Sequence, residues 1–210
     1  MLNTHEISCK RGRHLLWQNL NITLAPGEVL LVKGANGSGK SSLLRMLAGL
    51  LLPLSGTVSW KSQAIQQNRY EYQAELLYIG HQVPLKPELS ALENLSSLCQ
   101  LHGDAPSISE IQHALATWML LSNTVHLPTK QLSQGQKQRV ALAQLTLSSQ
   151  ALWILDEPFN GLDTQGSNIL KDHLEQHQSA QKLTVLTSHL HENLQSLLPS
   201  LSTQEKILQL

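Results

Sequence analysis

The residues whose types and spacing most directly indicate chemistry lie between positions 34 and 41, where the sequence matches the pattern G-x-x-x-x-G-K-[ST]. Glycines let the backbone curl so that successive N–H groups surround an anion, and Lys40 adds a full positive charge. The hydroxyl of Ser41 is a ligand for Mg²⁺. The pattern therefore predicts a loop that binds the phosphates of a nucleoside triphosphate. The residues assigned to this loop are Gly34, Ala35, Asn36, Gly37, Ser38, Gly39, Lys40, Ser41 and Ser42.

The segments on either side of the loop have the order that phosphate binding requires. Residues 29–32 are continuously apolar and predict a buried strand. After the loop, leucines at helical spacing, the last of them Leu50 and Leu51, predict a helix, and Pro53 is expected to end it. The positive N-terminal end of this helix would point at the phosphates. A glycine-rich turn that binds nothing is the alternative, and the strand–loop–helix order favours the phosphate loop.

Further polar side chains follow three other apolar segments. These segments, at residues 76–79, 151–155 and 183–187, predict buried strands, and the polar residues after them are Gln82, the pair Asp156 and Glu157, and His189. Continuous apolar strands that alternate with helices indicate a mostly parallel sheet covered on both faces. Because ligands bind at the carboxyl ends of such strands, we expect these residues to meet the phosphate loop.

Each of these polar residues has a predicted role in phosphoryl transfer. Asp156 closes a buried strand, where an acid without a function would be costly, so it is the predicted Mg²⁺ ligand together with Ser41. Glu157 is the candidate general base for the attacking water. Gln82 can reach the metal or the water, and His189 can donate a hydrogen bond to the γ-phosphate. For Gln82 or His189 alone, an ordinary polar group would be the better interpretation.

A second helix start that could bind an anion lies at residues 132–136. Ser133 fits an N-cap and Gln136 the reciprocal position of a capping box, and two basic residues follow. The triphosphate is already bound by its own loop. A second helix start that could bind phosphate therefore suggests that residues 132–136 contact the nucleotide of another subunit. An ordinary capped helix is the alternative.

The chain is predicted to be a single domain, 1–210, with an inserted helical block. Capping boxes at Ser90 and Ser107 start two helices, and the apolar stripe of the second is expected to run through Trp118 and Met119. The block spans residues 84–130, between α/β parts at 1–83 and 131–210. It could contact a partner, or it could serve packing alone. The first thirty residues predict two short strands around a turn at residues 11–13 and a further, separate strand at residues 20–24, and residues 61–73 predict an exposed loop.

Composition limits the class of protein. Hydrophobic residues make up 41% of the chain, which indicates a globular protein. The 15 basic residues balance 15 acidic ones, so the chain lacks the net positive charge that favours binding to nucleic acid. Cys9 and Cys99 form no metal or redox motif, and with no signal peptide this suggests a reducing cytoplasm. No apolar run reaches the roughly 20 residues that span a bilayer. His173 and His177 share a helix face, but two ligands without a third make a poor metal site.

Taken in order, the motifs resemble those of the ATP-binding subunit of an ABC transporter. Residues 34–41 resemble Walker A, Gln82 the Q-loop, residues 132–136 the LSGGQ signature, residues 152–157 Walker B, residues 160–163 the D-loop, and His189 the switch histidine. The resemblance implies the α/β fold of an ABC ATPase, a P-loop NTPase core with a small antiparallel β subdomain and a helical subdomain. It also implies a head-to-tail dimer around two ATP molecules, in which Ser133, Gly135 and Gln136 of one copy face the γ-phosphate bound by the other.

The sequence departs from the family pattern at three places. Gln134 replaces the first signature glycine, while Gly135 keeps the second, and Asn160 with Gly161 replaces the usual Ser-Ala of the D-loop. The family's adenine-stacking aromatic residue would fall near Arg11. A guanidinium plane can stack on a base, so Arg11 is either a weak nucleotide-binding candidate or a solvated turn residue.

Residues 78–82, 90–95 and 152–159 also resemble the ATP-binding subunits of bacterial haem exporters that serve cytochrome c maturation. That resemblance implies membrane partners of the CcmB, CcmC and small CcmD types, a peripheral place on the cytoplasmic face of the inner membrane, and release of a haem-loaded periplasmic chaperone on ATP hydrolysis. An exporter for a drug, a lipid or a lipoprotein is the realistic alternative. A soluble ABC ATPase acting on nucleic acid, or a small-molecule kinase that uses the same loop, agrees less well with the motifs.

Overall fold

The computed structural model describes residues 1–103, 105–188 and 205–210. The chain forms two compact units. Unit 1 contains Met1–His81, Gln150–Pro158 and Glu175–Leu210, and unit 2 contains Gln82–Ser149 and Phe159–Leu174. Unit 2 includes the predicted helical block at residues 84–130 together with residues 131–149 and 159–174, and the boundaries of the predicted inserted domain stay a prediction.

The elements of unit 1 are β1 (Leu2–Arg11), β2 (His14–Leu24), β3 (Val29–Lys33), α1 (Lys40–Leu47), β4 (Ser55–Trp60), β5 (Gln63–Ala64), α2 (Arg69–Ala74), β6 (Leu76–Ile79), β7 (Leu152–Leu155), β8 (Leu183–Thr187) and β9 (Glu205–Gln209). Those of unit 2 are α3 (Ala91–Leu101), α4 (Ile108–Thr117), the 3-10 helix η1 (Thr129–Gln131), α5 (Gln134–Leu142) and α6 (Gln144–Leu147). Helix α7 (Thr164–Ser179) begins in unit 2 and ends in unit 1.

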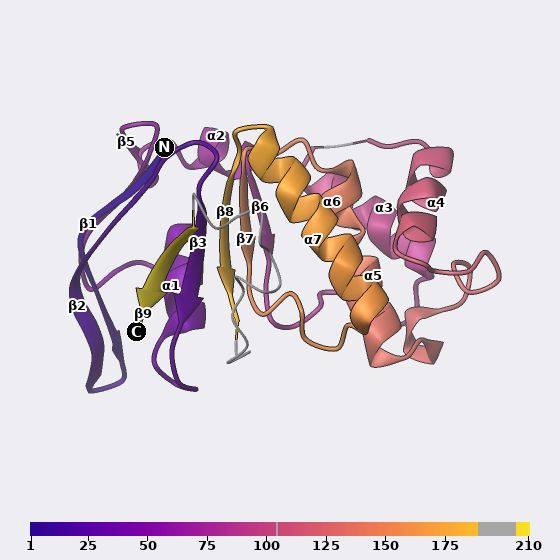
Figure 1. The fold of residues 1–210 in the computed structure, drawn as a ribbon, viewed down its shortest axis with the longest axis horizontal. Coiled ribbons are helices and arrows are strands. Elements are labelled where there is room, and N and C mark those ends of the chain that lie inside the picture. The colour runs from indigo at the N-terminus through magenta and orange to yellow at the C-terminus, as the bar shows by residue number, and fades with distance from the viewer. Residues whose placement is uncertain (104, 189–204) are drawn as a thin grey trace. The chain divides into compact units, whose positions relative to one another are not determined.

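Among the described residues, five strands form a parallel sheet in the order β6-β7-β8-β3-β9. Their arrows point to the same edge of the sheet in Figure 1. Every residue of β7 and of β8 is buried, as expected for strands covered on both faces. The predicted fold class, an α/β fold with a mostly parallel sheet, is confirmed.

A smaller antiparallel sheet in the order β2-β1-β4-β5 contains the N-terminal strands. Strand β2 pairs with β1 from Leu24 opposite Leu2 to His14 opposite Arg11. The prediction of separate short strands here was wrong, because β2 is continuous over its 11 residues. Polar and apolar residues alternate irregularly in β2, and this irregularity suggested that the strand is interrupted. Its pairing with β1 along most of its length makes it one continuous strand.

A single hydrophobic core joins both sheets of unit 1 through α1. It contains Leu43, Leu44 and Leu47 of α1, Leu2 and Leu24 of the antiparallel sheet, and Leu30, Ile154 and Val185 of the parallel sheet. The first residue of α1 is the lysine of the phosphate loop, so the burial of this helix anchors the loop to the core.

Helix α1 is shorter than the spacing of its leucines predicts. It ends at Leu47 with Ala48 as the C-cap, and Gly49 then takes the left-handed conformation at φ +70°. Leu50 and Leu51, predicted as core residues, are therefore 53% and 39% exposed. The prediction that Pro53 ends the helix was wrong, since a glycine cap ends it first.

Residues 61–73, predicted to be an exposed loop, contain β5 and all but the last residue of α2. The prediction failed because Tyr72 of α2 is buried in the core of unit 1, where its hydroxyl donates a hydrogen bond to the carbonyl of Leu47. Burial raises the pKa of the Tyr72 phenol. One buried aromatic residue thus stabilises a short helix whose other residues are mostly polar.

The two helix starts predicted in unit 2 are confirmed. Ser90 and Ser107 are the N-caps of α3 and α4, and each forms a complete capping box with the glutamate three residues later. Trp118 is fully buried, as predicted, but Met119 is 44% exposed at φ +59° because α4 ends at Thr117. In the described part of the chain, no helix is long and apolar enough to cross a membrane.

The histidines His173 and His177 on α7 belong to separate hydrogen-bond networks. The ring of His173 contacts Thr146 through Nε2 (2.9 Å) and the carbonyl of Ile169 through Nδ1 (2.8 Å). The ring of His177 stacks on Trp153 with centroids 3.7 Å apart. Among the described residues, no group of three or more His, Cys, Asp or Glu side chains could hold a metal ion.

The surroundings of the buried histidine His177 favour its neutral form. Its Nε2–H donates to the carbonyl of Gln150 (3.2 Å), and its Nδ1 accepts from the hydroxyl of Thr184 (3.1 Å). Burial lowers the pKa of His177 from 6.5 to about 4, an effect that the Gln150 carbonyl opposes and the charge of Lys182 reinforces. Since a proton on this ring is disfavoured only in the folded state, folding stability depends on pH.

We predict that the free energy of unfolding falls as the pH is lowered from about 6.5 to about 4. In this range the unfolded chain binds a proton at residue 177 that the folded chain rejects, and the contribution lost is about 3 kcal/mol. Urea unfolding of the wild type and of His177→Asn at several pH values measures the difference. The stability gap between the two proteins should shrink on acidification, and a constant gap would contradict a neutral His177.

Candidate functional site

The phosphate loop of unit 1 follows β3 and leads into α1, as the sequence predicts. The side chain of Lys40, the first residue of α1, is only 5% exposed. Its Nζ donates hydrogen bonds to the carbonyl oxygens of Gly34 (2.8 Å) and Ala35 (3.1 Å). Lysine is almost never buried without such partners, so the carbonyl groups of the loop stabilise the buried charge of Lys40. Ala35, Asn36 and Gly37 at the tip of the loop are exposed.

Two glycines of the loop have no room for a side chain. A Cβ on Gly34 would lie 2.6 Å from Ser38 Oγ and 2.8 Å from the backbone oxygen of Leu210. A Cβ on Gly39, which has φ +106°, would lie 2.6 Å from Nε1 of Trp17. The loop is therefore packed between Leu210, the residue after β9, and Trp17 of β2, and sequence reading missed the contact of Trp17.

The loop also contains a polar atom that a ligand would satisfy. Ser38 Oγ is buried and has no hydrogen-bond partner among the residues that the structure describes. A buried hydroxyl without a partner is costly, and a phosphate oxygen would accept its hydrogen. Together with the buried ammonium group of Lys40, this donor set fits the triphosphate predicted from the sequence. Ser42 of the same loop forms a hydrogen bond with the thiol of Cys9. Burial raises the pKa of this thiol, and the hydrogen bond with Ser42 opposes only part of that rise.

The acidic pair predicted from the sequence follows β7. In the sheet, β8 is the one strand between β7 and β3, so the pair and the phosphate loop leave the same edge of the sheet. Asp156 is 3% exposed, and its backbone N–H donates to the carbonyl of Ile79 (2.8 Å). Hydroxyl and carboxylate oxygens are the hard ligands that Mg²⁺ prefers, so Ser41 and Asp156 fit this ion.

Glu157 has an unusual backbone conformation and two close partners. Its φ is +54°, a left-handed conformation that residues other than glycine seldom adopt. Its N–H donates to Thr187 Oγ1 (2.7 Å), and its Oε2 lies 3.5 Å from Nδ1 of His81. Thr187 and His81 were missed by sequence reading. A threonine that ends an apolar strand directly before Ser188 and His189 was the available signal.

The other predicted residues of the ATP site are placed as follows. Gln82 is exposed and is the first residue of unit 2, three positions after β6. Arg11 is exposed at the last position of β1, where the hairpin turns. His189 lies outside the described residues. The roles of Gln82, Arg11 and His189 stay predictions.

The predicted signature segment begins α5 in unit 2. Ser133 is its N-cap, with the capping box completed by Gln136: the Gln136 N–H donates to Ser133 Oγ (3.2 Å) and the Ser133 N–H to Gln136 Oε1 (2.9 Å). A Cβ on Gly135 would lie 2.9 Å from the carbonyl oxygen of Gly161, so the signature and the D-loop segment meet at two glycines. The change from Ser-Ala to Asn160 and Gly161 therefore falls where the signature packs.

An ion pair reinforces this contact between the signature helix and the D-loop segment. Arg139 NH2 donates to both carboxylate oxygens of Asp163, at 2.7 Å and 2.6 Å. The N–H of Gly166 also donates to Asp163 Oδ1 (2.8 Å). The Gly166 hydrogen bond and Arg139 lower the pKa of Asp163. Arg139 is one of the two basic residues that follow the predicted anion-binding helix start, and the sequence did not reveal that it pairs with Asp163.

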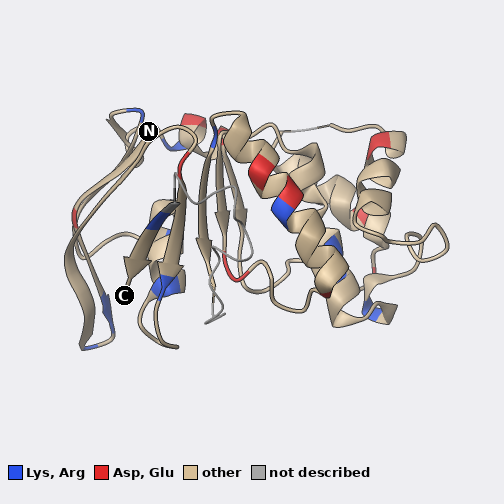
Figure 2. Ribbon diagram, viewed as in Figure 1, with Lys and Arg blue, Asp and Glu red and all other residues tan. Residues whose placement is uncertain are grey.

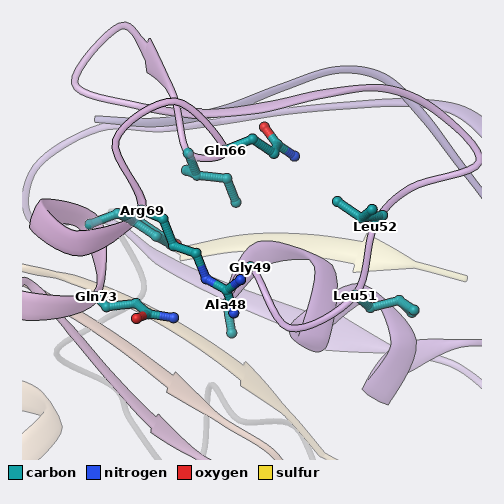
Figure 3. A pocket seen from close by; sticks show the side chains of 9 residues that line it. Ala48, Gly49, Leu51, Leu52, Gln66, Arg69 and Gln73 are labelled. Carbon is teal, nitrogen blue, oxygen red and sulfur yellow. The ribbon is translucent and has the colours of Figure 1, made fainter.

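A small cavity of about 110 Å³ lies at the end of α1 that is opposite to the phosphate loop. Its lining residues are Ala48, Gly49, Leu51, Leu52, Ile65, Gln66, Arg69, Tyr72 and Gln73, and Figure 3 shows Arg69 reaching toward Ala48 and Gly49. None of these residues belongs to the predicted ATP site. Basic and acidic residues are interspersed along the elements of each unit (Figure 2).

The sequence is similar to a protein family and to individual known proteins. The family model described as ABC transporter matches residues 17–160. A protein of Histophilus somni, described as cytochrome c biogenesis ATP-binding export protein CcmA, is 44% identical over 188 residues, which cover 90% of this chain and 86% of the relative. A protein of Methylococcus capsulatus with the same description is 46% identical over 183 residues, which cover 87% and 88%.

Solved structures with a similar fold are ATP-binding cassettes. One, described as a dimer in a post-hydrolysis state bound to ADP and Pi, has a TM-score of 0.81 at 23% identity, with 100% of this chain and 94% of that chain covered. Another, a putative ABC transporter ATP-binding protein of Pyrococcus furiosus, has a TM-score of 0.78 at 22% identity, with 91% and 93% covered. At these identities the likeness establishes the fold.

Proposed function

The chain belongs to the ABC transporter family, and we propose that it is the ATP-hydrolysing subunit of an export complex that serves cytochrome c biogenesis. One observation carries the catalytic part: a single parallel sheet brings the Lys40 loop and the pair Asp156 and Glu157 to the same edge. The relatives' shared description supports the part that concerns cytochrome c.

The proposed ATP site assigns a role to each residue at this edge. The loop from Gly34 to Ser42 binds the triphosphate, with the charge of Lys40 facing the β- and γ-phosphates. Ser41, Asp156 and Gln82 hold Mg²⁺, which when bound neutralises charge on the phosphate oxygens. Glu157, whose backbone is left-handed, takes a proton from the attacking water. His189 donates a hydrogen bond to the γ-phosphate.

We also propose that two copies of the chain bind two ATP molecules head to tail. Ser133, Gly135 and Gln136 begin α5, whose N-terminal end attracts anions. Ser133 and Gln134 are exposed, so this helix end is available to a second copy. A solved cassette with the same fold is described as a dimer bound to ADP and Pi.

The membrane partners of the complex are subunits of the CcmB, CcmC and CcmD types. In this proposal the chain docks on them at the cytoplasmic face of the bacterial inner membrane as a peripheral subunit. ATP hydrolysis then drives a step in haem export, the release of the haem-loaded periplasmic chaperone. The shared description of relatives that are 44% and 46% identical over most of this chain supports export in cytochrome c biogenesis, and the partner types and the chaperone step follow from the resemblance of the sequence motifs.

Complementation tests this function. We expect the wild-type chain to restore c-type cytochromes, measured by haem staining, in a bacterium that lacks its own cytochrome c biogenesis ATP-binding subunit. Lys40→Ala should fail because it removes the phosphate-binding charge. Lys61→Ala is the matched control, since it removes an exposed lysine that pairs with Glu75. A chain that binds ATP but never restores cytochromes would indicate another substrate, such as a drug, a lipid or a lipoprotein.

A further inference from the structure

The hydroxyl of Thr187 joins both members of the acidic pair. Thr187 is the last residue of β8 and is fully buried. Its hydroxyl donates a hydrogen bond to Asp156 Oδ1 (2.8 Å) and accepts one from the N–H of Glu157 (2.7 Å). Because β7 and β8 pair in parallel with Leu155 opposite Leu186, the residues that follow are neighbours at the edge of the sheet. One side chain thus contacts two residues that the proposed mechanism uses.

The directions of these two hydrogen bonds follow from their chemistry. A backbone N–H can only donate, so Thr187 Oγ1 must accept from Glu157. The hydroxyl hydrogen is then left for the carboxylate of Asp156. With Oδ1 committed in this way, the rotation of the carboxylate is restricted, and Oδ2 is the oxygen left for a cation. The same hydroxyl holds the N–H of a residue whose backbone is left-handed at φ +54°.

We propose that Thr187 is a positioning residue for ATP hydrolysis, whose hydroxyl orients Asp156 toward Mg²⁺ and holds Glu157 in its left-handed conformation. This inference rests on the proposed function. It adds a residue to the site that lies in no phosphate-binding or acidic motif. Partners that orient a metal ligand affect metal affinity or activity about 10- to 100-fold when they are removed.

The substitution Thr187→Val tests the proposal, since valine has nearly the same shape and lacks the hydroxyl. The full chain is titrated with Mn²⁺, a paramagnetic substitute for Mg²⁺, in the presence of a non-hydrolysable ATP analogue. We expect Mn²⁺ to bind about 10-fold more weakly to Thr187→Val. Affinity for the analogue in EDTA should not change, because the phosphate loop is intact. Thr187→Ser keeps the hydroxyl and should bind Mn²⁺ as the wild type does.

The matched control is Thr184→Val, which removes a buried hydroxyl from the same strand. Thr184 donates its hydrogen bond to His177, away from the acidic pair, so its loss should lower stability and leave Mn²⁺ affinity unchanged. Wild-type Mn²⁺ affinity in Thr187→Val, or an equal loss in Thr184→Val, would overturn the proposal. Thr187→Ala provides the same comparison if the valine variant does not fold.

The proposed function and this inference fail in different ways. A wild-type chain that binds no Mn²⁺ with the analogue would overturn both, and it is recognised without any variant. If the wild type binds Mn²⁺ together with the ATP analogue and Thr187→Val binds them equally well, only the proposed role of Thr187 is overturned.

Discussion

Replacing Glu157 with glutamine is expected to slow ATP turnover at least about 100-fold, because glutamine cannot accept the proton of the attacking water. Nucleotide binding should persist, since Lys40 and the phosphate loop are untouched. The N–H of residue 157 remains able to donate to Thr187, so the left-handed backbone is retained. The variant should therefore bind ATP and accumulate as a closed dimer that does not turn over.

Light scattering after size-exclusion chromatography, run in ATP and in ADP, measures this outcome beside a hydrolysis assay. The dimer should form with ATP in Glu157→Gln and be absent with ADP. Glu75→Gln is the matched control, because Glu75 lies in unit 1 and pairs with Lys61. Unchanged hydrolysis in Glu157→Gln would remove Glu157 from the role of general base.

A mixture of two inactive variants is expected to recover one working site for each mixed dimer. Lys40→Ala loses the charge that Gly34 and Ala35 surround, so its own loop cannot hold ATP. Ser133→Arg keeps that loop but places a long side chain at the N-cap of α5, where the partner's phosphate would bind. In a mixed dimer, the loop of the Ser133→Arg chain meets the intact signature of the Lys40→Ala chain, and the other site is doubly damaged.

Random mixing of equal amounts should restore about a quarter of the wild-type rate, since about half of the dimers are mixed and each has one complete site. Ser107→Arg is the matched control, because Ser107 is also the N-cap of a helix in unit 2 with a complete capping box. That variant should hydrolyse ATP without mixing. Full recovery in the mixture, or activity in either variant alone, would contradict a site shared between two copies.

The sequence alone was sufficient for several structural features that depend on residues close together in the chain. The capping boxes of Ser90, Ser107 and Ser133 all form, because each closes within four residues. The phosphate loop follows its strand and begins its helix for the same reason. Short, mostly apolar segments such as residues 183–187 predict strands correctly, since their apolar and β-branched residues favour buried strands.

Other features were missed or predicted wrongly, either because a distant contact sets them or because a helix cap overrides the spacing of apolar residues. Tyr72 makes a helix of a polar segment by entering the core, and the spacing of polar residues around it does not reveal that burial. Leu50 and Leu51 continue a helical spacing, yet the glycine after Ala48 ends the helix and leaves them exposed. In both places tertiary packing or a cap outweighs periodicity.

The sequence by itself determined where three helices begin and which segments are buried strands, and it predicted the residues that bind a triphosphate. Only the tertiary structure decided the strand order β6-β7-β8-β3-β9, the position of β9 beside β3, and the contact of Thr187 with Asp156 and Glu157. The physical reason is that local features need only neighbouring residues. The order of strands in a sheet, and the side chains that meet at its edge, depend on pairings between segments far apart in the chain, such as residues 156 and 187.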